Sequence, residues 1–133
     1  MKLFLKFIIL FTLFMEIAFA ESATNAKDLY SSCYDYDLWI NGNFKKPVDD
    51  KSLFLMGKCQ GIVESIGKTM YTLCLERKRN LNIPRQITAD LGNIRTRELI
   101  SIFVKNSEGK TNLSSKSAYT YLLDIFSKSK PCD

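Results

Sequence analysis

Apolar residues recur at helical spacing in four separate stretches of the chain. The first stretch, residues 27–40, places apolar side chains at steps of four, three and four, so that they share one helix face: Leu29, Cys33, Tyr36 and Ile40. An Asn-Gly-Asn sequence and Pro47 then interrupt the pattern. A longer second helix is expected over residues 51–73, where Asp49 or Asp50 can cap it by accepting its free backbone N–H groups.

Two shorter helices are expected in the second half of the chain. The third is predicted to begin near Thr96 as a cap, and its apolar arc is wide enough for it to be largely buried: Leu99, Ile100, Ile102, Phe103 and Val104. The fourth is predicted to begin near Ser114 or Ser115, with these residues on one side: Ala118, Tyr119, Leu122, Leu123, Ile125 and Phe126. Strand-like alternation is hard to find, so the predicted fold is a small all-α bundle of about four main helices.

Two glycines, Gly57 and Gly61, stand four residues apart inside the second helix, where each costs roughly 1 kcal/mol relative to alanine. On a helical wheel they fall on the polar flank, so packing of the apolar face does not require them. That face has Cys59 at its centre and consists of Leu55, Cys59, Ile62, Val63, Ile66, Met70 and Leu73. We therefore predict an interface at the glycines, with a backbone approaching either from the same chain or from a second subunit or partner protein.

The first helix carries a second stripe beside its core face. Tyr30, Tyr34 and Leu38 follow at steps of four, and Trp39 points to another side. Tyrosines in a small bundle commonly line the rim of the core, and tyrosine and tryptophan also anchor binding interfaces. Both interpretations stay open, and the stripe is included in the predicted interface.

The first 20 residues have the order of a secretory signal peptide. Lys2 and Lys6 precede an apolar run from residue 7 to residue 15, and Ala18-Phe19-Ala20 offers a cleavage site. A membrane anchor is the rival interpretation, but the run is short of the roughly 20 apolar residues that a span needs. Cleavage leaves one domain, residues 21–133, and lowers the net charge from +5 to +4 because the leader carries two lysines and one glutamate. This mild excess favours acidic partners or wall polymers over nucleic acid.

All four cysteines follow the leader, and an even count in a small exported chain is typical of disulfides. Cys33 and Cys59 lie mid-helix on the apolar faces of two helices joined by a short loop, so they are expected to pair. That leaves Cys74, at the end of the second helix, to bind Cys132 in the tail. Free buried thiols are the alternative.

The residue types that are missing argue against an enzyme. The chain contains no histidine, which removes the Ser-His and Cys-His nucleophilic pairs and the commonest neutral metal ligand. The cysteine spacing lacks the close pairs of a zinc site. Acid pairs such as Asp35/Asp37 could in principle hydrolyse glycosides, but neighbouring surface acids are usually caps or solvated charges. We expect no catalytic residues, no metal and no cofactor.

A series of short motifs follows the leader, with cysteines in the first two helices and at the end of the chain: Cys33, Phe54-Leu55-x-Gly57-x-x-x-Gly61-Ile62, Cys74, Ser117-Ala118 and Pro131-Cys132. From about residue 27 to residue 132 the chain thereby resembles the Rap–Tai family, the resistance-associated and type VI amidase immunity proteins. It differs from the family in the 21 residues between Cys74 and Thr96, where the family reaches its third helix within a few residues.

The resemblance implies a periplasmic, often dimeric protein that binds and blocks a cognate type VI secretion toxin, a peptidoglycan amidase. Members of the amidase-immunity kind insert a loop between helices into the catalytic groove. One polar loop, residues 76–95, is basic. It is either a candidate for this contact or simply a solvated surface loop. The other, residues 105–114, is our predicted toxin-binding loop, although a flexible connector would look similar: Asn106, Ser107, Glu108, Lys110 and Asn112.

Two other classes of function fit the same features. One is a small periplasmic helical chaperone or stress protein, although small acid chaperones typically bear one disulfide and two are expected here. The other is a secreted effector that acts by binding. A homodimer and a cognate amidase are the predicted partners, with no nucleic acid and, after signal cleavage, no membrane.

Overall fold

Four α-helices dominate the part of the chain that the computed structural model describes, residues 24–80 and 82–133. They are α2 (Ala26–Ile40), α3 (Asp50–Arg79), α4 (Thr96–Ser107) and α5 (Ala118–Ser129), accompanied by the short 3-10 helices η1 (Arg85–Ile87) and η2 (Leu113–Ser115). No strand is formed by these described residues, and the prediction of an all-α bundle is confirmed. The predicted signal peptide, residues 1–20, lies outside them.

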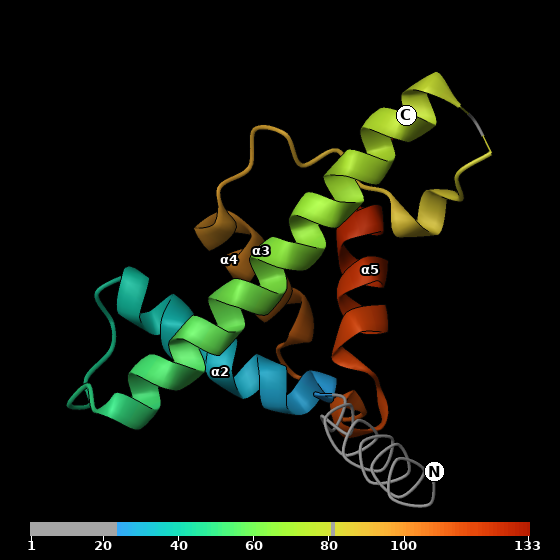
Figure 1. Ribbon diagram of the computed structural model, residues 1–133. Helices are drawn as coiled ribbons and strands as arrows, with labels where there is room; N and C mark the ends of the chain where they lie inside the picture. Colours follow the sequence, from blue (N-terminus) through green and yellow to red (C-terminus); the bar gives the residue numbers. More distant parts are fainter. Residues whose placement is uncertain (1–23, 81) are drawn as a thin grey trace, which may run out of the picture.

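The long helix α3 organises the bundle. Its 30 residues give it a length of about 45 Å at 1.5 Å per residue. Figure 1 shows α2 crossing the N-terminal half of α3, while α5 lies along the C-terminal half. The starts of α2 and α5 are tied together, because the Ala26 N–H donates to the Lys116 carbonyl at 2.9 Å and the Ala118 N–H donates to the Thr24 carbonyl at 3.0 Å.

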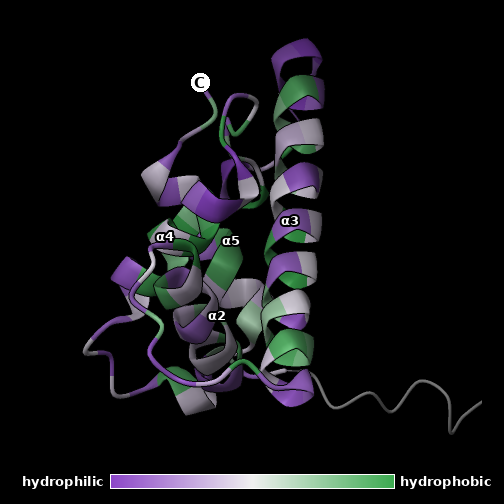
Figure 2. Cartoon of the chain, turned by 90° about the vertical axis from the view of Figure 1, so that its left-hand side faces the viewer, coloured by the Kyte–Doolittle hydropathy of each residue, from purple (hydrophilic) through white to green (hydrophobic). Residues whose placement is uncertain are grey.

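The apolar faces of all four helices meet in one core. Figure 2 shows the hydrophobic stretch of α5 enclosed between α3 and α4. The largest fully buried side chains come from every helix: Leu29, Val63, Met70, Ile100, Phe103, Leu122 and Phe126. These seven residues all belong to the apolar stripes that the periodicity predicts.

Two disulfides link the helices as predicted. Cys33 of α2 is bonded to Cys59 of α3, with their Cα atoms 5.1 Å apart. Cys74 of α3 is bonded to Cys132 in the tail, with a Cα–Cα distance of 5.7 Å. All four cysteines are buried and none is free, so the alternative of buried thiols is wrong.

The ends of the helices differ from the prediction in three places. The second helix does not end at Leu73 but continues to Arg79. The fourth begins at Ala118, because Ser114 and Ser115 form part of η2 instead. Thr96 is the first residue of α4 and does not cap it, since the cap position is taken by Arg95, whose side chain makes no capping hydrogen bond.

The predicted cap of α3 is confirmed at Asp49. Its carboxylate accepts the Ser52 N–H at 2.7 Å, and this hydrogen bond lowers the pKa of Asp49 below its ordinary value. The cap fixes where the long helix begins and therefore how its first two turns project.

One core residue of α5 was assigned to the wrong side. Tyr119 is 53% exposed, whereas Tyr121, left out of the predicted stripe, is buried. The Tyr121 ring packs edge-on against Phe103 at 6.2 Å, and its hydroxyl donates to the Asn106 carbonyl at 3.1 Å. A partner for its one polar atom allows this tyrosine to be buried.

Candidate functional site

The two glycines of the predicted interface lie on the solvent side of α3. A Cβ atom built at Gly57 or at Gly61 meets no heavy atom within 4 Å beyond its own stretch of helix. No other backbone of the described chain approaches them, so the alternative of an internal helix crossing is wrong. Contact with another molecule stays a prediction for this flank.

Close approach between helices occurs instead at Gly67, a position that the sequence analysis did not single out. Gly67 is buried, and a Cβ built there would lie 2.7 Å from Cδ1 of Leu99 and 3.7 Å from Cδ1 of Leu91. The available signal was its spacing, since Gly67 follows the core residue Val63 by four positions. The missing side chain lets α4 pack closely against α3.

Gly61 borders a shallow hollow between α3 and the start of α5. The hollow has a volume of about 450 Å³ and is lined by Thr24, Gly61, Ile62, Ser65, Ile66, Ser117, Ala118 and Tyr119. Its rim carries the exposed Tyr119 ring. The open flank of α3 is therefore continuous with a surface that could receive side chains of another molecule.

The predicted tyrosine stripe on α2 is partly covered. Tyr30 and Leu38 are half-buried, whereas Tyr34 is 41% exposed, and the two tyrosine rings lie 5.8 Å apart. Burial raises the pKa of Tyr30, and the negative charge of Glu108 adds to the effect. The stripe therefore lines the rim of the core at Tyr30 and Leu38 and exposes an aromatic ring at Tyr34. Tyr30 also lies near Glu108, a residue of the predicted toxin-binding loop.

That predicted loop is shorter than expected. Asn106 and Ser107 belong to the last turn of α4, and Ser107 is buried, with its hydroxyl donating to the Phe103 carbonyl at 2.7 Å. Ser107 is therefore removed from the predicted contact residues, because its side chain already has its partner inside the bundle. The four remaining predicted residues, Asn106, Glu108, Lys110 and Asn112, are exposed, and the Asn106 side chain donates to the Ile102 carbonyl at 2.8 Å.

Both ends of this shorter loop, residues 108–112, are held by the core. Ser107 is buried before it and Leu113 is buried after it. The Lys110 N–H donates to the Ser107 carbonyl at 3.2 Å, and Gly109 has a φ of +70°, a conformation that favours glycine. The loop therefore presents its polar side chains on a turn with fixed ends.

The other polar loop, predicted over residues 76–95, is largely built into the fold. Its first four residues are helical, and the Arg77 guanidinium donates to the Ile83 carbonyl. Lys78 pairs with Asp90 at 2.9 Å, and this hydrogen bond lowers the pKa of Asp90 and raises that of Lys78. The Asp90 N–H donates to the Lys130 carbonyl at 2.9 Å, which joins the loop to the tail.

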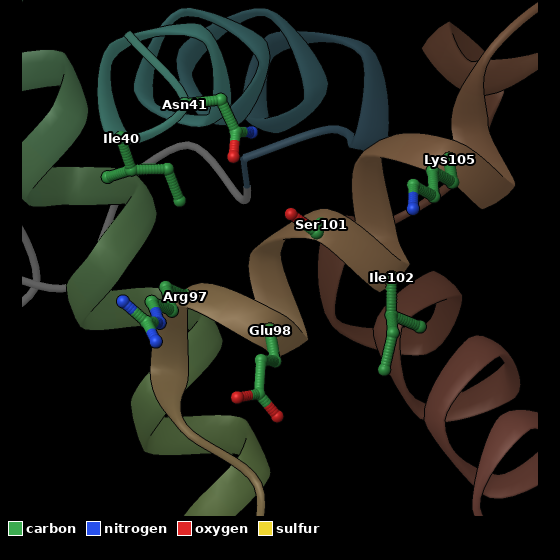
Figure 3. Close-up of a pocket in the computed structure, with 7 residues that line it drawn as sticks. All are labelled: Ile40, Asn41, Arg97, Glu98, Ser101, Ile102 and Lys105. Atoms are coloured by element: carbon green, nitrogen blue, oxygen red, sulfur yellow. The ribbon is translucent and has the colours of Figure 1, made fainter.

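A polar hollow of about 360 Å³ lies between the end of α2 and α4 (Figure 3). Its lining comes from both helices: Ile40, Asn41, Arg97, Glu98, Ser101, Ile102 and Lys105. Arg97, Ser101 and Lys105 are four residues apart and share one face of α4, and the Ser101 hydroxyl donates to the Asp37 carboxylate. The mixture of charges can bind polar groups of another molecule.

The sequence analysis did not single out one further exposed feature, a group of apolar side chains at the start of α3. Val48, Leu53 and Phe54, which we call the α3 tip, are 44%, 54% and 71% exposed. The helical wheel contained the signal, because Leu53 and Phe54 fall outside the arc centred on Cys59. Apolar side chains that project at the end of a helix commonly mark a contact surface.

Comparison with models of protein families, with curated proteins and with solved structures found no match. Across residues 24–80 and 82–133, no group of three or more side chains could hold a metal ion. No helix in the same residues is long and apolar enough to cross a membrane. The disulfides themselves indicate an oxidising compartment.

Proposed function

We propose that the protein is a periplasmic immunity protein that binds a cognate type VI secretion peptidoglycan amidase and blocks it by occupancy. The observation that carries the proposal is the polar loop 108–112, which projects from a disulfide-linked helical scaffold while the residues on both sides of it are buried. The resemblance of the cysteine and glycine motifs to the Rap–Tai family supplies the kind of partner.

The geometry of the loop suits inhibition by insertion. A segment whose ends are fixed loses little conformational entropy on binding, so more of its contact energy remains as affinity. Glu108 and Lys110 offer opposite charges on the two sides of Gly109, and Tyr34 adds an exposed ring on α2. Charged side chains on a defined turn and an exposed aromatic ring are both features of specific protein contacts.

The scaffold supports action outside the cytoplasm. Two buried disulfides persist in an oxidising compartment, and the N-terminal sequence has the order of a signal peptide. A periplasmic immunity protein would meet its toxin where the cell wall is degraded. This agrees with the cellular site at which a peptidoglycan amidase acts.

The test is co-expression of the full chain with a small Cys-His amidase encoded by a neighbouring gene, with the amidase directed to the periplasm. Growth should be rescued by the wild-type chain and reduced by the double charge reversal Glu108→Arg and Lys110→Glu. The matched control exchanges the exposed ion pair at the end of α3, Glu76→Arg and Arg79→Glu, and should rescue fully. Growth arrest despite equal amounts of wild-type protein would contradict the proposal.

A titration in vitro distinguishes occupancy from turnover. Amidase activity on isolated peptidoglycan should fall linearly and reach its minimum at a fixed molar ratio of the two proteins. Inhibition that keeps growing with time at sub-stoichiometric amounts would point to an enzyme. Suppression of aggregation of unrelated unfolded proteins, with no effect on the amidase, would favour the chaperone alternative.

A further inference from the structure

We propose that the α3 tip docks on the surface of an anionic phospholipid membrane. The inference concerns a different surface from loop 108–112 and does not depend on the immunity function. It also replaces our expectation that the protein has no membrane contact after signal cleavage. The expected mode is attachment to the lipid surface, with the tip entering the headgroup region and no helix crossing the bilayer.

The apolar part of the tip projects from the start of the longest helix. Phe54 is the most exposed of the large apolar side chains that are solvent-accessible, at 71%, and its neighbour Leu53 is 54% exposed. Because Asp49 caps α3, Val48 and Leu53 occupy the positions before and after the cap that pack together in a hydrophobic staple. Figure 1 shows this end of α3 at one edge of the molecule, beside the loop that leads in from α2.

Four exposed lysines stand in the same stretch of chain as this apolar group: Lys45, Lys46, Lys51 and Lys58. None of them forms an ion pair with the described residues. Segment 41–58 also contains Asp49, which is engaged by the Ser52 N–H, and Asp50, so its net charge is +2. Lysine side chains can place their alkyl stems along the apolar group while their ammonium groups reach lipid phosphates.

The composition of this segment favours lipid over a protein partner. The cores of protein interfaces are depleted in lysine and enriched in arginine, methionine and aromatic residues. Segment 41–58 has four lysines and no arginine, tyrosine or tryptophan, whereas Phe44, Phe54 and Met56 suit a protein and a lipid contact equally, so the lysines decide between the two. Leucine and phenylalanine beside several lysines are instead the combination found on helices that lie at membrane interfaces.

The experiment is co-sedimentation of the disulfide-bonded mature chain with vesicles, either of phosphatidylcholine alone or of phosphatidylcholine with phosphatidylglycerol. We expect binding to the phosphatidylglycerol vesicles only, weakening as salt is added. Phe54→Ser should weaken the binding about tenfold, since it removes a buried phenyl ring from the interface. The pair Lys45→Gln and Lys46→Gln should weaken it about tenfold or more, since each lysine near an anionic surface contributes a severalfold increase.

The control is Leu75→Ser, which removes an exposed apolar side chain, 40% accessible, from the C-terminal half of α3. It should leave vesicle binding unchanged, and circular dichroism should show that every variant keeps the helical fold. The proposal is overturned if wild type does not bind phosphatidylglycerol vesicles, or if Phe54→Ser and Leu75→Ser bind equally well. It is also overturned if Phe54→Ser lowers the mass in solution while vesicle binding stays the same, because a second copy would then cover the tip.

Discussion

The two halves of α3 expose a similar share of their residues but differ in what lies over their glycines and their outward apolar side chains. The C-terminal half is covered by its own chain at three positions: Leu99 fills the space over Gly67, Cys132 is bonded to Cys74, and Lys78 pairs with Asp90. The N-terminal half is held on one side by the Cys33–Cys59 bond, and its opposite side is open at Gly57, Gly61 and the α3 tip. One continuous helix thus combines a structural half with a half that presents surface.

The comparison shows that glycines of the same helix stand in two different environments. At Gly67 the packing of Leu99 offsets the helix-propensity cost of about 1 kcal/mol. At Gly57 and Gly61 nothing within the described chain offsets that cost. The predicted contact with another molecule would explain these two glycines, which is the reason to test this flank first.

The largest effect is expected from the disulfides. Replacing Cys74 and Cys132 by alanine should lower the free energy of unfolding by about 4 kcal/mol, since the bond spans 58 residues, and replacing Cys33 and Cys59, which span 26, by about 3.5 kcal/mol. Urea denaturation without reductant measures both. An unchanged unfolding free energy for the Cys74/Cys132 variant would mean that the covered half does not depend on its bond.

Substituting glycines should change the free energy of unfolding by a smaller amount, and in opposite directions in the two halves of α3. Gly67→Leu should lower the free energy of unfolding by about 1–3 kcal/mol, because the added side chain overpacks the contact with Leu99. Gly57→Ala is the matched control and should raise it by up to about 1 kcal/mol, because a Cβ there meets open space. Thermal unfolding at low protein concentration compares them, and equal shifts in the same direction would contradict the difference between the halves.

The smallest effect concerns pH and the Lys78–Asp90 pair. The pKa of Asp90 is lowered by the hydrogen bond from Lys78, so the pair stabilises the fold above the ordinary aspartate pKa of 3.8 and is lost as the pH falls through the lower folded value. Asp90→Asn should therefore reduce stability slightly at neutral pH and make no difference in strong acid. A stability gap between wild type and Asp90→Asn that widens on acidification would show that the sign is wrong.

Much of the fold followed from the sequence because it depends on local patterns. The helical spacing of apolar residues predicted four helices, the position of Cys33 and Cys59 on apolar faces predicted their bond, and Asp49 stands where a cap is expected. Each of these inferences uses residues within one helix or two adjacent helices. Such patterns can be recognised from the spacing of residues alone, so predicting them requires no knowledge of the tertiary structure.

The parts that could not be predicted depend on distant segments. The extension of α3 from Leu73 to Arg79 has a mostly charged sequence, and it is held by Ile83 and Asp90 from the following loop. Gly67 gains its role from Leu99, which lies 32 positions along the chain. Ser107 looked like part of a polar loop because nothing in its neighbours shows that its hydroxyl bonds back to Phe103 inside the core. Tertiary contacts decide each of these positions.

The most direct test of the open half is the mass in solution of wild type and Gly61→Leu, measured at the same concentrations together with their melting temperatures. If the flank contacts a second copy, wild type should have the mass of a dimer and Gly61→Leu that of a monomer. The melting temperature of the variant, measured where both proteins are monomeric, should be unchanged or slightly higher, because no atom of the described chain lies within 4 Å of the added Cβ. Identical masses combined with a lower melting temperature for Gly61→Leu would contradict the account.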